Sequence, residues 1–362
     1  MHKNILTVIG ITILFLGTYI TPSVAIDNQI KPISNGNTLY VGGTGEGNYS
    51  SIQDAIDNAS IGDTVFVYDD SSPYYENVVV DKSINLIGED KNTTIIDADG
   101  IGSVVRLAVN YITVSGFTIQ NSGNKPETNS GIEAGRFGSQ ADYSIIKDNK
   151  IVNNWDGIHS VFSNECHYIN NIIMNNRNHG IYLRACDENC NISYNIIKNN
   201  KENGMVIHEK GHFVFRNIIE NNSIGILFSD CEVTENIFNN NNYGIITGDF
   251  GKIYSNKVTN NSIGIFIYGG IHNEIKHNNL LKNSRHVSFD LLFLFRFILP
   301  LFIYPFQLNK WRSNYYEGHR FGPKIIRGKM IFDIESEISI PWINIDWFPA
   351  KEPYNIDWLK EC

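Results

Sequence analysis

Hydrophobic and polar positions repeat along the middle of the chain, from Ser144 to Phe289, with a period of 19 to 24 residues. Each repeat contains a word of the type Asn-x-Ile-x-Asn-Asn, and most repeats continue with Gly-Ile or Gly-Met a few residues later. The first Asn of the word recurs at positions 149, 171, 195, 217, 236, 256 and 278. A period of this size is typical of a solenoid, in which each repeat buries its apolar face against its neighbours.

Apolar and polar residues alternate on both sides of each Asn and again after each glycine. This alternation predicts short β-strands, because successive side chains of a strand point to opposite faces. No repeat carries a helical stripe, and Asn, Gly and Ile are poor helix formers. We therefore predict an all-β fold, a parallel β-helix over residues 76–289. It should be right-handed, because parallel crossover connections almost always are.

Three columns of apolar residues should form the interior of this solenoid. They stand three residues before the Asn, two residues after it and one residue after the glycine. Their members are Ile146, Tyr168, Ile192, Val214, Val233, Ile253 and Ile275; Ile151, Ile173, Ile197, Ile219, Phe238, Val258 and Leu280; and Ile158, Ile181, Met205, Ile226, Ile245, Ile265 and Val287. The repeated Asn is expected at bends with positive φ, where its amide can stack on the amides of neighbouring coils.

These repeats resemble the right-handed β-helix repeats of the pectin-lyase-like superfamily, in particular the branch named after the periplasmic copper-accessory protein NosD. The Asn-x-Ile-x-Asn-Asn-x-x-Gly-Ile coils carry the resemblance, together with upstream words at residues 49–59 and 62–67. It covers residues 38–289, and the aromatic tail is similar to the segment that closes NosD-like β-helices. The resemblance implies a fold rather than an activity, because one scaffold carries many chemistries.

The first 25 residues read as an export signal. Lys3 supplies the positive charge, Ile5–Ile20 is an apolar run, and Ser23–Ala25 offers small residues at the cleavage site. An uncleaved membrane anchor is the alternative, although the run is shorter than a typical membrane span. The folded part is therefore expected outside the cytoplasm, in the periplasm, at the cell surface or secreted, with no transmembrane helix in the mature chain.

Two terminal segments should cap the solenoid. Residues 26–75 form an N-terminal segment in which Ser51–Ala59 has a helical apolar face, with Ser51 as its N-cap. Residues 290–362 form a C-terminal cap that contains four of the five tryptophans. The apolar stretch 291–306 is expected to pack on the solenoid, because it is short and contains Arg and Pro.

The net charge of the chain argues against one class of binding partner, nucleic acid. The chain carries 29 Lys and Arg against 38 Asp and Glu, a formal net charge of −9, and has no basic cluster. Nucleic acid is therefore not expected as a ligand.

Five cysteines are too few for a disulfide scaffold. Cys166, Cys190 and Cys231 all stand five residues before the repeated Asn, which predicts a column of small buried residues. A bridge between Cys186 and Cys190 is left open. A thiolate metal site with His167 is also an alternative, but the spacing matches no zinc pattern. No cofactor is evident, and calcium is the one ion kept as an alternative.

Side chains two and four positions after the glycine, and those just before it, should point outward. The first half of this outer face is polar and ionisable. Catalytic candidates are Asp156, His159, His179, Tyr182, Arg184 and His208, and substrate-binding candidates are Glu133, Tyr182, Arg184 and Trp311. Uronate lyases and epimerases need a base, an acid and a positive group. His159 and Tyr182, about 4.8 Å apart in adjacent coils, fit the first two roles, and Arg184 beside His208 fits the third.

The second half of this face is apolar and contains Val206, Leu227, Ile246 and Phe266. Such a strip on a water-soluble protein implies a cover, for which residues 290–306 are the candidate.

These features predict an exported polysaccharide-binding or adhesive surface scaffold, whose partner is a polysaccharide or another cell-envelope glycan. One alternative is a polysaccharide-modifying enzyme of the lyase, epimerase or hydrolase type. The other is a metal-related accessory role like that of NosD. The oligomeric state is left open.

Overall fold

The computed structural model describes residues 36–126, 128–186, 189–292, 309–333, 338–356 and 358. By its internal contacts the chain divides into Met1–Pro32 and a compact unit, Ile33–Cys362. The predicted export signal, residues 1–25, and residues 293–306 of the apolar stretch lie outside the described residues. Within the described part of the chain, no helix is long and apolar enough to span a membrane.

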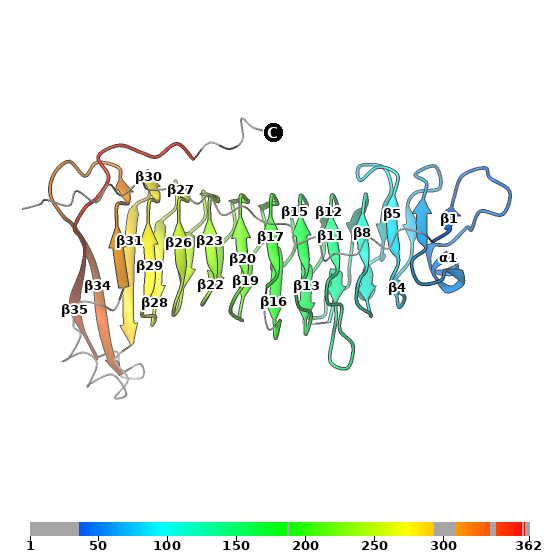
Figure 1. The fold of residues 1–362 in the computed structure, drawn as a ribbon, viewed down its shortest axis with the longest axis horizontal. Helices are drawn as coiled ribbons and strands as arrows, with labels where there is room; N and C mark the ends of the chain where they lie inside the picture. The colour runs from blue at the N-terminus through cyan, green and yellow to red at the C-terminus, as the bar shows by residue number, and fades with distance from the viewer. Residues whose placement is uncertain are drawn as a thin grey trace, which may run out of the picture. The chain divides into compact units, whose positions relative to one another are not determined.

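The described strands form three sheets that stack coil upon coil (Figure 1). The first sheet contains β1(Thr38–Val41), β2(Thr64–Val67), β5(Asn85–Gly88), β8(Thr113–Ser115), β11(Ile145–Lys147), β14(His167–Ile169), β17(Asn191–Ser193), β20(Phe213–Phe215), β23(Glu232–Thr234), β26(Lys252–Tyr254), β29(Asn273–Lys276) and β32(Asn309–Arg312). The second sheet contains β3(Tyr74–Tyr75), β6(Ile95–Asp97), β9(Thr118–Gln120), β12(Lys150–Val152), β15(Ile172–Met174), β18(Ile196–Lys198), β21(Ile218–Glu220), β24(Ile237–Asn239), β27(Lys257–Thr259), β30(Asn279–Leu281) and β33(Tyr315–Tyr316). The third sheet contains β4(Val78–Val80), β7(Val105–Leu107), β10(Ser130–Ala134), β13(Asp156–Val161), β16(Ile181–Arg184), β19(Asn203–Ile207), β22(Ile224–Phe228), β25(Tyr243–Thr247), β28(Ile263–Tyr268), β31(Arg285–Leu292), β34(Lys324–Asp333) and β35(Ile338–Asp346).

Each coil takes one strand from each sheet, and each strand pairs in parallel with the equivalent strand of the next coil. The coil β17, β18 and β19, for example, pairs with β20, β21 and β22. The predicted parallel β-helix is confirmed, and its handedness stays a prediction. Parallel pairing begins at β1 with β2 and continues past residue 289 through β32 and β33, on both sides of the predicted range. Only β34 and β35 pair in antiparallel fashion among the described strands.

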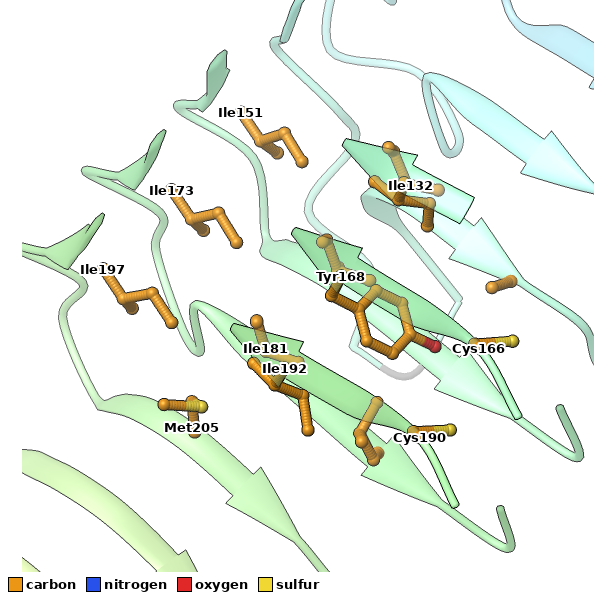
Figure 2. Close-up of a cluster of buried hydrophobic side chains, with 14 of the residues drawn as sticks. Ile132, Ile151, Cys166, Tyr168, Ile173, Ile181, Cys190, Ile192, Ile197 and Met205 are labelled. Atoms are coloured by element: carbon orange, nitrogen blue, oxygen red, sulfur yellow. The ribbon is translucent and has the colours of Figure 1, made fainter. Parts of the chain in front are cut away.

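The three predicted apolar columns line the interior. Figure 2 shows Ile151, Ile173 and Ile197 aligned in successive coils. All members of the columns are buried, and all but Val287 are no more than 1% exposed. Burial of this kind stabilises each coil only through its neighbours, at roughly 25 cal/mol per Å² of apolar surface.

The repeated Asn forms a buried ladder through the stack. The Oδ1 atom of Asn217 accepts hydrogen bonds from the backbone N–H and the side-chain Nδ2 of Asn195, both at 2.9 Å. Its own Nδ2 donates to the carbonyl of Ile192 in the preceding coil, at 2.8 Å. The same pattern runs from Asn149 to Asn314, so the amides stack as expected. A second ladder runs from Asn154 to Asn283.

The prediction that the ladder Asn itself has positive φ is wrong. The left-handed conformation falls one residue earlier, for example at Tyr194, Arg216 and Glu235, with φ values of 59°, 51° and 55°. In the Asn-Asn pair that ends a repeat word the first Asn has positive φ and the second joins the second ladder, as at Asn199 and Asn200. The bend at the first residue directs the second side chain inward, where its amide meets the next coil.

A short helix covers the N-terminal end of the stack, as predicted. Helix α1(Ile52–Asn58) lies against β1, β2 and β4. The Ser51 hydroxyl accepts from the N–H of Asp54 at 3.2 Å, and the Glu76 carboxylate accepts from the N–H groups of Ile52 and Gln53, both at 2.9 Å. These bonds satisfy N–H groups that the first helical turn leaves free. The buried face of the helix consists of Ile52, Ala55 and Ile56.

Asp346 ends the Asn ladder at the C-terminal end. Its Oδ2 atom accepts from the backbone N–H and Nδ2 of Asn314, both at 3.1 Å, and from the hydroxyl of Tyr316 at 3.3 Å. The side chain is fully buried and occupies the place that the next Asn would take. The tail then runs back along the stack, and the Trp358 indole N–H donates to the carbonyl of Glu235 at 2.8 Å. The tail is therefore part of the fold.

Replacing one ladder residue should destabilise the protein far more than replacing an exposed Asn. Asn217→Ala leaves the Asn195 N–H buried without a partner and removes the bonds to the Asn195 amide and the Ile192 carbonyl, so we expect it to lower the free energy of unfolding by about 3–5 kcal/mol. Asn221→Gly is the matched control, because Asn221 has a φ of 57° that glycine adopts without strain. It should change that free energy by about 1 kcal/mol or less. Urea denaturation measures both variants, and equal losses would contradict the ladder's role.

Candidate functional site

Polar side chains form one row across the outer face of the third sheet, on four consecutive coils. Arg106 in β7 is in register with Glu133 in β10, Glu133 with His159 in β13, and His159 with Tyr182 in β16. We call these four residues the polar row. The register brings together the predicted pair His159 and Tyr182. Arg184 lies beside His208 in the next coil, since the N–H of His208 bonds the carbonyl of Leu183.

Asp156 and His159 form a buried hydrogen-bonded pair within β13. The Nδ1 atom of His159 lies 3.1 Å from Oδ2 of Asp156. The carboxylate also accepts from Nδ2 of Asn178 at 2.9 Å and from the N–H of His179 at 3.0 Å. Asp156 is 2% exposed and His159 is 5% exposed. Because an ionised carboxylate only accepts hydrogen bonds, His159 carries its proton on Nδ1 and leaves Nε2 unprotonated in its neutral form.

Three imidazoles surround the ring of Tyr182. The ring centroids of His159, His179 and His208 lie 4.9, 5.4 and 5.3 Å from that of Tyr182. His179 stacks on it at an interplanar angle of 8°, and burial lowers the pKa of His179 in spite of the nearby Asp156 carboxylate. Tyr182 and His179 are half-buried, and His208 is exposed. The cluster therefore runs from buried Asp156 to the surface.

Glu133 is held from two sides. Its carboxylate pairs with Arg136, with Nε and Oε1 3.0 Å apart, and accepts from the hydroxyl of Ser103 at 3.2 Å. Arg106, the next member of the polar row, has a buried Nε without a hydrogen-bond partner among the described residues. Sequence reasoning missed Arg106 and Arg136. Arg106 lies in an early irregular coil without the Asn word, and Arg136 lies in a loop after its strand.

Trp311 does not lie on the outer face. It pairs in register with Ile275, extends an interior column and is 5% exposed. The predicted sugar-stacking role does not fit this position, because the side chain continues an interior column of the stack. Trp311 occupies a position of β32 at which side chains of the first sheet point inward. Its place in the aromatic tail of the sequence did not indicate this direction.

The apolar half of the outer face is largely buried. Val206 is 3% exposed and Ile246 is 8% exposed, while Leu227 and Phe266 are half-buried. The segment expected to cover this strip lies mostly outside the described residues. Its first part, Asp290 to Leu292, pairs with β34 in the third sheet.

The predicted cysteine column is buried, and Cys186 and Cys190 are free thiols rather than a bridge. The Sγ atoms of Cys166 and Cys186 donate to the carbonyls of Ala141 and Ser160, at 3.2 and 3.4 Å. Burial raises the pKa of Cys186 to about 11. The Cys186 thiol is therefore protonated at neutral pH, and the buried cysteines serve as small core residues.

His212 takes the place of a thiol in this column. Its Nδ1 accepts from the N–H of Cys190 at 3.2 Å, and its Nε2 lies 3.1 Å from the carbonyl of Cys186. Both ring nitrogens are therefore occupied by backbone groups, and burial lowers the pKa of His212 below its usual value of 6.5.

Comparison with family models identifies the chain. The model of the family described as "Periplasmic copper-binding protein (NosD)" matches residues 56–249, more than half of the 362 residues. The chain belongs to the NosD family. The match covers most of the Asn ladder and every residue of the polar row, and it bears out the resemblance seen in the repeats. No curated protein matches the sequence.

Solved structures with the same fold are distant in sequence. The A-module of the mannuronan C-5 epimerase AlgE6 from Azotobacter vinelandii is 14% identical, with a TM-score of 0.53, over 66% of this NosD-family chain and 74% of that chain. The A-module of AlgE4 from the same organism is 15% identical, with a TM-score of 0.52, over 66% and 86%. The Dettilon tailspike protein is 13% identical, with a TM-score of 0.52, over 71% and 58%. At these identities the likeness shows the fold alone.

The described residues do not fit a copper site, although the family description names copper. No group of three or more His, Cys, Asp or Glu side chains in the described part of the chain could hold a metal ion. Copper ligands need free thiolate or imidazole lone pairs. The buried thiols of Cys166 and Cys186 donate to carbonyls, and both nitrogens of His212 are engaged.

Replacing His212 should remove part of the acid sensitivity of the fold. Since its pKa is lower in the folded than in the unfolded chain, the unfolded state binds the proton first, and stability falls as the pH drops below about 6.5. Above that value both states are neutral and the effect is absent. His212→Asn keeps the contacts, because Asn273 at the equivalent position accepts from the N–H of Gly251 and donates to the carbonyl of Gly248.

We expect the loss of unfolding free energy between about pH 7 and about pH 5 to be smaller in His212→Asn than in the wild type. Urea denaturation at each pH measures it. The exposed His272, replaced in His272→Asn, is the control and should leave the loss unchanged. An unchanged loss in His212→Asn would contradict the assignment.

Proposed function

We propose that this NosD-family protein is exported and binds a polysaccharide along the polar row of its third sheet. The observation that carries the proposal is the row itself: Arg106, Glu133, His159 and Tyr182 on four consecutive coils in register. Coils repeat about every 4.8 Å, so a chain of sugars lying along the stack would meet a donor or acceptor at each step. The family description, which names a periplasmic protein, supports the location.

The row is organised before any ligand arrives. Glu133 is fixed by Arg136 and Ser103, His159 is fixed by Asp156, and Tyr182 is enclosed by imidazoles. Groups already held in place lose little side-chain entropy on binding, which favours affinity. The buried Nε of Arg106 lacks a partner among the described residues and is a donor for a hydroxyl or carboxylate oxygen. Solved neighbours of the same fold include proteins named as mannuronan epimerases.

A polysaccharide lyase or epimerase is the second candidate, favoured by the pair of Asp156 and His159. The carboxylate holds the Nδ1 proton, so Nε2 of His159 is the basic nitrogen, and the Tyr182 ring lies beside it. In this hypothesis His159 removes the proton next to a sugar carboxylate. The Tyr182 hydroxyl donates a proton to the leaving glycosidic oxygen in a lyase reaction, or to the opposite face of the same sugar carbon in an epimerase reaction. Arg184 and His208 then stabilise the negative charge that develops on the sugar carboxylate.

A polysaccharide array with residues 26–362 tests both candidates, when bound glycan and released unsaturated uronate products are read together. We expect binding without product release. Arg106→Ala and Tyr182→Phe should each weaken binding by about tenfold, which corresponds to the loss of one charged or polar contact. Lys252→Ala, an exposed cation on the first sheet, is the control and should bind like the wild type.

Product release that disappears in His159→Ala, with an unchanged melting temperature, would favour the enzyme over the scaffold. Absence of binding to any polysaccharide, or equal binding by all variants, would contradict the proposed site.

A further inference from the structure

The C-terminal end of the stack concentrates exposed apolar side chains. Of the sixteen large hydrophobic side chains exposed in the described part of the chain, six lie between Phe321 and Phe348. Phe321 is 90% exposed, Trp347 is 61% exposed and Phe348 is 72% exposed. They belong to the hairpin of β34 and β35 and its flanking turns, at the end of the stack opposite α1 (Figure 1).

The pairing of the hairpin gathers these side chains at one place. Lys324 pairs with Asp346, so Phe321, three residues earlier, and Trp347 and Phe348, directly after, lie at the same open end. Ile325 and Ile343 are both 53% exposed and continue this surface along the outer face of the hairpin. The C-terminal patch consists of Phe321, Ile325, Ile343, Trp347 and Phe348.

The patch carries positive charge on an acidic protein. Four Lys and Arg and no Asp or Glu stand between Gly318 and Phe332, although the formal net charge of the chain is −9. Arg320 and Arg327 are exposed, while Lys329 pairs with Asp290 at 3.4 Å. The opposite end has the reverse charge, because residues 36–81 contain eight Asp and Glu and no Lys or Arg. Residues 309–362 as a whole balance eight Lys and Arg against eight Asp and Glu, so the positive charge is confined to the patch, whereas the N-terminal end is acidic.

We propose that the C-terminal patch docks the protein on the surface of an anionic lipid bilayer. Exposed Phe, Trp and Ile side chains enter the boundary between headgroups and acyl chains, and Arg320 and Arg327 attract the anionic headgroups. The acidic end is repelled by the same surface, so the stack stands with its N-terminal end away from the membrane. This docking is peripheral and needs no membrane-spanning helix.

A second copy of the chain is a poorer occupant of the patch. A twofold interface brings each patch against its own equivalent, so it would gather the exposed Arg320 and Arg327 of both copies in one buried surface. Like charges across an interface cost affinity, whereas anionic headgroups neutralise them.

Vesicle sedimentation tests the proposal with residues 26–362, which contain the compact unit Ile33–Cys362 whole. Vesicles of phosphatidylcholine with phosphatidylglycerol should bind the protein, vesicles of phosphatidylcholine alone should bind it more weakly, and added salt should reduce binding. The double variant Phe321→Ser, Trp347→Ser and the charge variant Arg327→Glu should each lower the partition coefficient by roughly tenfold. Melting temperatures and circular dichroism check that the variants fold.

Phe137→Ser is the matched control, because Phe137 is 91% exposed in a loop after β10, outside the patch. It should bind vesicles like the wild type. No binding of the wild type to anionic vesicles at low salt would overturn the proposal, as would equal binding by the wild type and both patch variants. A dimer that dissociates in the same patch variants, without vesicle binding, would identify a self-association surface and likewise overturn it.

Discussion

The stack depends on the hydrogen bonds that each ladder Asn makes to the coil before it. Asn217 satisfies the backbone N–H of Asn195, which lies at the bend between two strands, and also donates to the carbonyl of Ile192 in the preceding coil. A buried backbone group left without a partner costs about 1–3 kcal/mol. The ladder therefore permits a sharp bend in the interior of the stack, where water has no access.

The ladder also fixes the register of the outer face. Because one amide of each coil bonds the equivalent amide of the next, the coils do not slip, and a slip of one residue would turn every interior side chain outward. The polar row follows from this register, since Glu133, His159 and Tyr182 lie on adjacent strands at the same position. At the end of the stack Asp346 accepts the bonds that no further Asn accepts, so the ladder closes with a carboxylate.

The repeat made the interior, the Asn stacking and the outward direction of His159 and Tyr182 predictable. What repeats in the sequence reports contacts between equivalent positions, and these are the contacts that build a solenoid. Contacts between unlike segments leave no such trace. The bonds of Asp346 to Asn314 and of Trp358 to Glu235 join positions 32 and 123 residues apart, and no period predicts them. The same holds for Trp311, which continues an interior column only because β32 adds one more strand to the first sheet.

Hydrogen exchange of the ladder amides tests the central claim most directly. If the ladder holds the stack together, the backbone N–H groups of Asn195, Asn217 and Asn236 exchange only when the whole stack unfolds, with the free energy of global unfolding. Amides in the outer loop around Gly47 exchange through local openings at much lower cost. Ladder amides that exchange as readily as those of this loop would contradict the account.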